Sequence, residues 1–296
     1  MTNATSIGPT RIIVPVDGSR AATAALDWAI AAIKSDVGRE STPALTLHIV
    51  HVVDVDPSVG LAVEVQAGAD GLLAAAADRA AANGASATVE RLQGRPWDEI
   101  VGAASADDWI VMGARGQTQF DRHRVGATVD RVVRLASCPV LAVPEDGCPA
   151  PGTLRSLVVG MDFSSDALAA LAHALPMLAP DATVVLVHGT PPPIVVSDGP
   201  VTPLPDIDVD GMLADSRAGL QRLIDERLPE SMNGVAAAMP VYPVHAIEDA
   251  ATRHKAELVA VGTHGRRGLP RLLMGSVAER VLHHVDCATL IARSNG

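Results

Sequence analysis

The chain has 296 residues, of which 48% are hydrophobic, 19% are charged and only 2% are aromatic. This composition can bury cores built from Ala, Val, Leu and Ile, and it argues against a disordered chain or an aromatic platform for single-stranded nucleic acid. The formal net charge of −11 opposes non-specific binding to nucleic acid or acidic membranes. An anionic ligand must therefore be held by local geometry, and no nucleic-acid partner is expected.

The first half of the chain alternates apolar runs typical of buried strands with helical patterns. Pro15 lies near the end of the first run, 11–16, where its missing N–H group indicates a strand end or an irregular edge. Ser19 follows and can cap the first helix, which is expected to run to about residue 33. The remaining elements of this half are predicted, in chain order, at 45–53, 69–82, 87–92, 96–104, 109–112, 127–135 and 140–143.

A short Gly- and Pro-containing segment, 147–152, is predicted to link two domains, 1–148 and 149–296. The order of elements then repeats at 157–161, 167–178, 183–188, 212–228, 235–242, 247–254, 258–261, 276–284 and 289–291. The Pro-rich segment 190–208 is expected to be either a functional lid or a surface loop. Alternating strands and helices predict an α/β fold, in which each half has a mostly parallel sheet of five strands with helices on both faces.

A glycine-rich segment follows the fourth predicted strand of each half. Gly113, Gly116 and Gly126 recur at positions 262, 265 and 275, a constant step of 149 residues that indicates an internal duplication. The same step relates Cys138 to Cys287. Glycine N–H groups, a Ser hydroxyl and the positive end of a helix suit a phosphate group. The alternative is a tight turn followed by an ordinary helix cap.

The spacing Gly-x-x-Gly, nine residues, Gly-Ser/Thr resembles the nucleotide signature of the universal stress protein family. Also similar to that family are Val-Asp-Gly-Ser at 16–19, His-Val at 51–52 and Arg-Pro-Trp-Asp-Glu-Ile at 95–100. The resemblance covers nearly the whole chain, as two tandem domains. It implies a Rossmann-like fold of the adenine nucleotide alpha hydrolase-like kind. Many members of the family bind ATP, some bind none, and many act in stress adaptation or growth arrest.

The resemblance also implies which residues contact the nucleotide. Asp17 and Asp162 are expected beside the adenine or ribose, and the backbone near Val52 and Gly189 beside the adenine. The residues two positions before these aspartates, Pro15 and Gly160, also belong to the expected sites. The ribose and phosphates are expected against Gly113, Gly116, Gly126, Ala127 and Thr128 in the first half, and against Gly262, Gly265, Gly275, Ser276 and Val277 in the second.

The two copies of the motif are unequal, because Ala127 stands where the motif has Ser or Thr. Thr128 offers a hydroxyl only one residue later. The first half therefore lacks one phosphate donor at the start of its helix. We expect both halves to bind ATP, the second more tightly.

The expected function is that of an ATP-binding regulator, with or without Mg²⁺, that meets an unidentified protein partner. The alternative is a slow ATP hydrolase or another enzyme of adenine nucleotides. We expect that the protein is not an enzyme, because no set of nucleophile, general base and partner is recognisable near Asp17 or Asp162. The sequence contains no Walker-type phosphate loop, and no Gly-x-Gly-x-x-Gly follows the first predicted strand.

The histidines and cysteines point to structural roles. His48 and His51 lie on opposite faces of one predicted strand, which makes them a poor ligand pair, and no metal site is expected. His51 and His188 are expected to be hydrogen-bonded at strand ends. The three cysteines form no CxxC pair and fit a reducing cytoplasm, with Cys138 and Cys287 as small core residues. No apolar run is long enough for a membrane span.

The two halves are expected to pack about a pseudo-two-fold axis, by analogy with two-fold dimers of single domains. The fifth strands, 140–143 and 289–292, are the candidate edges for pairing. A homodimer of tandem chains is a further expectation from the family.

Overall fold

The computed structural model describes residues 9–36, 44–54, 62–116, 125–191, 208–263 and 275–294. The first half contains β1 (Arg11–Pro15), α1 (Arg20–Asp36), β2 (Thr46–Val53), α2 (Ala62–Ala82), β3 (Ala87–Gln93), α3 (Pro96–Gly102), β4 (Asp108–Gly113), α4 (Ala127–Leu135) and β5 (Val140–Val143). The second half contains β6 (Leu154–Gly160), α5 (Ser165–Ala174), a 3₁₀ turn (Leu175–Met177), β7 (Leu178–Gly189), α6 (Val209–Arg227), β8 (Asn233–Met239), α7 (Pro243–Arg253), β9 (Leu258–Gly262), α8 (Ser276–His284) and β10 (Ala288–Ala292).

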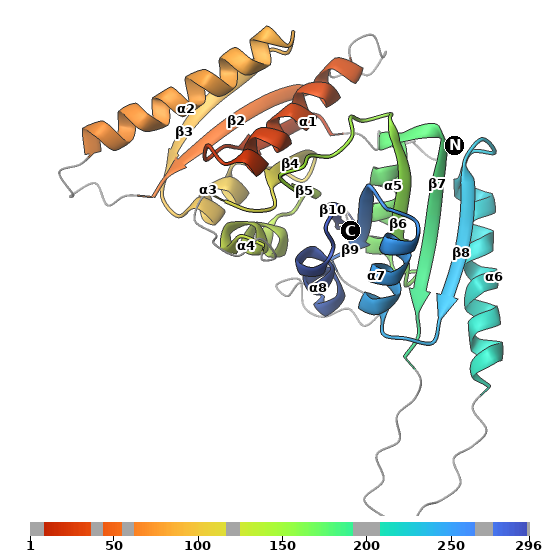
Figure 1. Ribbon diagram of the computed structural model, residues 1–296. Helices are drawn as coiled ribbons and strands as arrows, with labels where there is room; N and C mark the ends of the chain where they lie inside the picture. The colour runs from red at the N-terminus through yellow and green to blue at the C-terminus, as the bar shows by residue number, and fades with distance from the viewer. Residues whose placement is uncertain are drawn as a thin grey trace, which may run out of the picture.

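Within these ranges ten strands form one continuous sheet, in the order β3-β2-β1-β4-β5-β10-β9-β6-β7-β8 (Figure 1). Neighbouring strands of the same half are parallel, as predicted. The halves meet where β5 and β10 pair in antiparallel fashion, with Leu141 opposite Leu290. The expected pairing of the fifth strands is therefore confirmed, and each half repeats the same strand order on its own side of this junction.

Helices cover both faces of the sheet, and each face has its own core. Buried residues of α1, α2, α5 and α6 pack with one set of alternate strand residues, and those of α3, α4, α7 and α8 pack with the other set. Ile12 and Ile13 illustrate the alternation, because these neighbours belong to opposite cores. None of the helices in the described ranges combines the length and the apolar character needed to cross a bilayer.

Several element boundaries differ from the predictions, and proline explains two of the differences. The predicted helix 167–178 is wrong beyond Ala174, because Pro176 cannot donate a hydrogen bond to the preceding turn. Leu178 instead pairs with Leu154, so that β7 is longer than the predicted 183–188. Pro243 opens α7 four residues earlier than expected, since proline fits the first turn of a helix. α2 likewise begins earlier, at Ala62.

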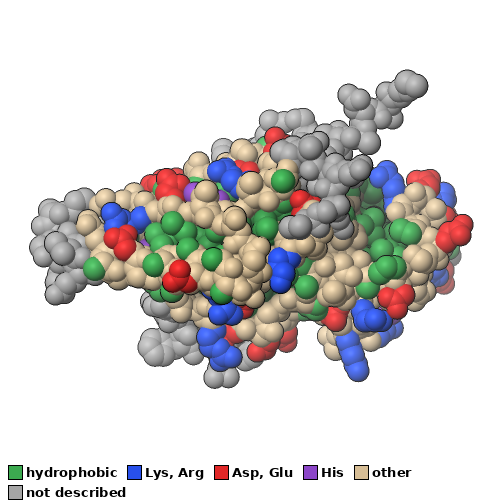
Figure 2. All heavy atoms as spheres, turned by 90° about the horizontal axis from the view of Figure 1, so that it is seen from above, with side chains coloured by type: hydrophobic (Ala, Val, Ile, Leu, Met, Phe, Trp, Pro, Cys, Tyr) green, Lys and Arg blue, Asp and Glu red, His purple; other side chains and the backbone are tan. Residues whose placement is uncertain are grey.

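Acidic and basic side chains are interspersed over the face of the molecule seen from above in Figure 2. The charged side chains form ion pairs such as Arg79–Asp27 and Arg91–Asp70, in which both partners are largely exposed. Pairs of this kind contribute little to stability in water. The fold therefore depends on its two apolar cores.

Candidate functional site

The strand order places the predicted site residues at the carboxyl edge of the sheet. In the first half β1 lies between β2 and β4, and in the second half β6 lies between β7 and β9. Because the chain leaves the central strand toward one neighbour and later adds a strand on the other side, a crevice opens at the central strand's carboxyl end. Asp17 and Asp162 follow the central strands, and the glycine segments follow β4 and β9.

The two aspartates open matching turns. Asp17 Oδ1 accepts a hydrogen bond from Ser19 N at 2.9 Å, and Asp162 Oδ1 accepts one from Ser164 N at 3.0 Å. Ser19 Oγ and Ser164 Oγ in turn accept hydrogen bonds from N–H groups in the first turns of α1 and α5, which confirms the predicted cap at Ser19. The residue after Asp162 is Phe163, whose φ of 63° is unusual for a bulky side chain.

Two histidines join the carboxyl ends of neighbouring strands. His51 Nδ1 lies 2.6 Å from Val16 O, and His188 Nδ1 lies 2.7 Å from Met161 O. Because a carbonyl oxygen only accepts, Nδ1 carries the proton in both rings. The prediction that these histidines are hydrogen-bonded at strand ends is confirmed.

The first glycine of each motif has a packing role. A Cβ atom on Gly113 would lie 2.6 Å from Ala22 N, and one on Gly262 would lie 2.6 Å from Ala167 N. No side chain fits at such a distance from a helix backbone. The contact between helix and strand therefore requires glycine at both positions, whether or not a ligand binds.

The last glycine of each motif precedes a helix. Gly126 N donates to Ala114 O at 3.1 Å, and Gly275 N donates to Thr263 O at 2.7 Å. Their φ angles of −66° and −63° are open to any residue, so the backbone conformation does not require glycine. Within the described residues the N–H groups of Ser276 and its neighbour have no hydrogen-bond acceptor, as is usual at a helix N-terminus.

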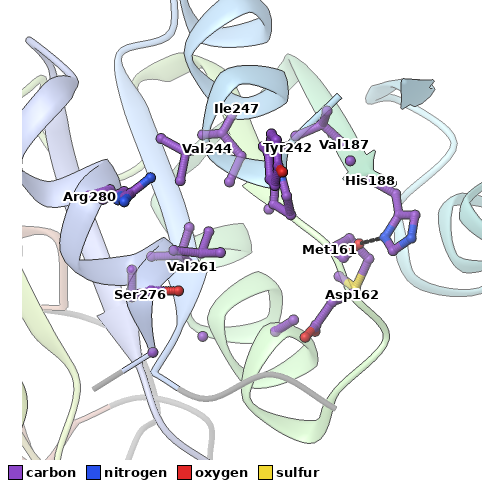
Figure 3. Close-up of a pocket in the computed structure, with 18 of the residues that line it drawn as sticks. Met161, Asp162, Val187, His188, Tyr242, Val244, Ile247, Val261, Ser276 and Arg280 are labelled. Carbon is purple, nitrogen blue, oxygen red and sulfur yellow. Dashed lines mark hydrogen bonds between the residues drawn. The ribbon is translucent and has the colours of Figure 1, made fainter. Parts of the chain in front are cut away.

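The crevice of the second half contains a cavity of about 550 Å³ (Figure 3). Seven predicted nucleotide contacts line it: Gly160, Asp162, Gly189, Gly262, Gly275, Ser276 and Val277. Asp162 and His188 lie on one side of the cavity, and Ser276 and Arg280 lie on the opposite side (Figure 3). Gly265, which was also predicted, lies outside the described residues.

The lining residues that were not predicted as nucleotide contacts include Tyr242, Val244, Ile247 and Arg280. The first three come from the start of α7, which the sequence placed too late. The available signal was Pro243, which is the first residue of α7 as Pro96 is the first residue of α3. Thr263 also lines the cavity, but its hydroxyl donates to Asp166 Oδ2 at 2.7 Å and supports the fold.

The first-half residues hold corresponding positions. Pro15 ends β1, which confirms the predicted strand end, and Val52 lies next to the last residue of β2. Ala127 and Thr128 begin α4. Gly116 lies beside the aspartate turn, where a Cβ atom would come within 3.1 Å of Asp17 Oδ2. The structure thus places all the predicted first-half residues at one edge of the sheet.

The cysteine thiols lack the properties of reactive thiolates. Burial raises the pKa of Cys138 and of Cys148 to about 12, and that of Cys287 to about 11. Cys138 is buried, as predicted, whereas Cys287 is half-buried. All three thiols are protonated at neutral pH and serve as small apolar groups.

Comparison with known proteins identifies the family. The universal stress protein family matches residues 9–144 and 153–293. A universal stress protein of Mycobacterium tuberculosis is 27% identical over 311 aligned residues, which cover 96% of this chain and 97% of the relative. A shorter universal stress protein, from Methanocaldococcus jannaschii, is 32% identical over 144 residues, which cover 45% of this chain and 81% of the relative.

Solved structures show the same fold over the full length. The structure of a universal stress protein from Archaeoglobus fulgidus superimposes with a TM-score of 0.69 at 19% identity, covering 96% of this chain and 98% of that one. One from Pseudomonas aeruginosa gives a TM-score of 0.59 at 16% identity, with 97% and 94% covered. The chain belongs to the universal stress protein family and is built from two tandem copies of its Rossmann-like α/β unit.

Proposed function

We propose that the second half of the chain binds ATP, and that this binding makes the protein a nucleotide-dependent regulator of stress adaptation or growth arrest. The observation that carries the proposal is the convergence of the seven predicted contacts on one cavity of about 550 Å³. This volume lies within the range of roughly 300–1,000 Å³ typical of small-molecule sites. It also fits the ATP binding that the family resemblance implies.

The cavity offers different chemistry at its two ends. Apolar side chains of Val187, Ile247 and Val261 suit the faces of a nucleobase. The hydroxyl of Ser276 and the N–H groups at the start of α8 suit a phosphate group. Gly275 precedes them in a backbone conformation that does not require glycine, and close approach of a phosphate accounts for the absence of a side chain there.

We further propose that ATP is bound without appreciable turnover. Among the described lining residues, Asp162 and His188 are candidates for a base, and each already makes a hydrogen bond at the carboxyl edge of the sheet. A regulator instead needs a partner that distinguishes the nucleotide-bound from the free form. The partner proposed is a protein, recognised through the surface around the cavity.

Isothermal titration calorimetry with ATP tests the binding site. S276A should weaken ATP binding at least about tenfold, because a hydrogen bond to a charged group contributes about 1.5–3 kcal/mol. The matched control is S231A, which removes an exposed serine hydroxyl near the amino end of β8, at the opposite edge of the sheet. Absence of ATP binding in the wild-type protein, or equal affinities of S276A and S231A, would contradict the proposed site.

A steady-state ATPase assay tests the absence of turnover, with D162A as the control for activity from this site. We expect no turnover above background in either protein. A turnover rate of about 1 s⁻¹ lies in the ordinary range of enzymes. If D162A abolished such a rate, the protein would be a hydrolase and the proposed regulatory function would be wrong.

A further inference from the structure

The starts of two helices bring different residues to the same place in the two halves. α3 begins with Pro96 and α7 begins with Pro243. The next residue is Trp97 in the first half and Val244 in the second. Val244 lines the cavity of the second half. Trp97 is therefore the first-half counterpart of Val244, a residue in the cavity wall of the second half.

A second wall position is also matched between the halves. α4 and α8 begin directly after the last glycine of each motif, and their fifth residues are Arg131 and Arg280. Arg280 lines the cavity of the second half. Arg131 is thus the first-half counterpart of another residue in the cavity wall.

In the first half these two positions are in direct contact. Arg131 Cζ lies 5.4 Å from the centroid of the Trp97 ring, within the range of a cation–π interaction. α3 contacts α4 as α7 contacts α8, so this contact joins the first-half counterparts of the two helices that border the cavity in the second half. Arg280, by contrast, makes no hydrogen bond or ion pair within the described ranges.

The strand end that faces this helix also carries a larger side chain in the first half than in the second. Gly189 lies so close to α7 that a Cβ atom there would be 2.6 Å from Pro243 Cα. The first half has Val52 at this position, so α3 must leave room for a side chain. Val52 and the half-buried Trp97 both pack against the core on the α3–α4 face. Side chains of the first half thus occupy the space between strand end and helix.

We propose that Trp97, held beneath Arg131, excludes nucleotide from the first half, so that each chain binds one nucleotide. The proposal rests on nucleotide binding by the second half. It narrows the sequence-based expectation of two sites to one. It also assigns the difference between the halves to Trp97 rather than to the missing hydroxyl at Ala127.

Calorimetric titration with ATP, counting sites per chain in four proteins, tests this proposal. The wild-type protein should bind one ATP. A127S restores the hydroxyl but keeps the indole, and it should still bind one. W97V/A127S should bind two, because the crevice is opened and the phosphate donor is present. V244W moves the indole to the second half, beneath Arg280, and should bind none. Circular dichroism and thermal unfolding check that each variant is folded.

The site counts separate the possible outcomes. Two sites in the wild-type protein, or in A127S alone, would overturn the proposal, as would a single site in folded W97V/A127S. V244W that is folded and binds ATP with wild-type affinity would also overturn it. If the wild-type protein bound no ATP, the proposed function of the second half would fail. W97V/A127S would then decide about Trp97 alone, with one site supporting its role and none contradicting it.

Discussion

The two halves share a hydrogen-bonded frame but surround their crevices with different side chains. In both halves an aspartate opens a capped turn, a histidine bonds to the carbonyl before that aspartate, and a glycine admits the helix against the strand. At the wall positions, however, Trp97 and Arg131 face each other in the first half, whereas Val244 and Arg280 border a cavity in the second. The frame preserves the fold, while the wall residues are those that we propose decide whether a nucleotide fits.

The amino edge of the sheet shows the opposite inequality. Asp108, at the start of β4, is buried and accepts hydrogen bonds from Arg11 and from Ser105. The same position in the second half is Glu257, whose carboxylate accepts a hydrogen bond from Arg155 N at 2.6 Å. At this position the first half thus has an ion pair with a buried aspartate, whereas the second half has a carboxylate bonded to a backbone N–H group.

Among the variants that test this difference between the halves, D108N is expected to have the largest effect on the free energy of unfolding. Removing the charge leaves Arg11 and Ser105 without their ionic partner at a site where the aspartate side chain is only 3% exposed. We expect a loss of about 3 kcal/mol in the free energy of unfolding, measured by urea denaturation. The matched control E257Q retains an acceptor oxygen and should lose about 0.5 kcal/mol or less. Equal losses would mean that the amino edges of the two halves are equivalent.

The stability contributed by Asp108 is also expected to depend on pH. Burial raises the pKa of Asp108, but hydrogen bonds from Arg11 and Ser105 outweigh burial and hold that pKa below its ordinary value. The stability due to the ionised group is therefore fully present above the ordinary carboxyl pKa of about 4 and is lost as the pH falls through the lower folded-state value. The difference between wild type and D108N should be constant near neutral pH and shrink in acid.

A second prediction separates the packing glycine from the ligand-facing glycine. G262A places a methyl group 2.6 Å from the backbone of α5 and should destabilise the protein by about 2 kcal/mol. G275A, at a φ of −63°, should leave stability nearly unchanged but weaken ATP binding. In the first half G113A should behave like G262A, whereas G126A should change neither stability nor ATP binding. Weaker ATP binding by G126A would place a nucleotide in the first half.

The sequence predicted the features that the duplication repeats. The step of 149 residues located both motifs, and the apolar runs located the strands of both halves. The fifth-strand junction was also predictable, since Val140–Val143 is wholly apolar and must be covered. These features follow from local pattern, which sequence shows directly.

The wall of the crevice was not predictable in the same way. Trp97 belongs to a segment whose resemblance to the family was recognised, but its ring contact with Arg131 depends on how α3 packs against α4. The start of α7 was missed because Tyr242 and Val244 lack a clear helical period beside Pro243. The ring contact joins side chains that meet across the fold, on which local pattern carries no information, whereas the start of α7 had a local signal in Pro243.

The smallest predicted effect concerns Arg280, which makes no ion pair with another described residue, and tests whether its charge contributes to ATP binding. Arg280 lies one helical turn beyond Ser276 and borders the same cavity. R280Q should weaken ATP binding about fivefold to tenfold and leave adenosine binding unchanged, because a largely exposed guanidinium contributes less to a phosphate than a buried one. Calorimetry with both ligands measures the ratio.

R131Q is the matched control, since Arg131 has the same place in its helix but contacts Trp97. It should leave ATP binding by the second half unchanged. An equal loss of ATP and adenosine affinity in R280Q would show that the aliphatic part of Arg280 packs against the nucleoside. The charge would then have no role in recognition, and the two halves would differ at this position only in what the arginine stem covers. A loss confined to ATP would instead show that the guanidinium of Arg280 contacts the phosphates. The arginines at this matching position would then differ in role, since Arg131 packs on Trp97 and Arg280 binds the nucleotide.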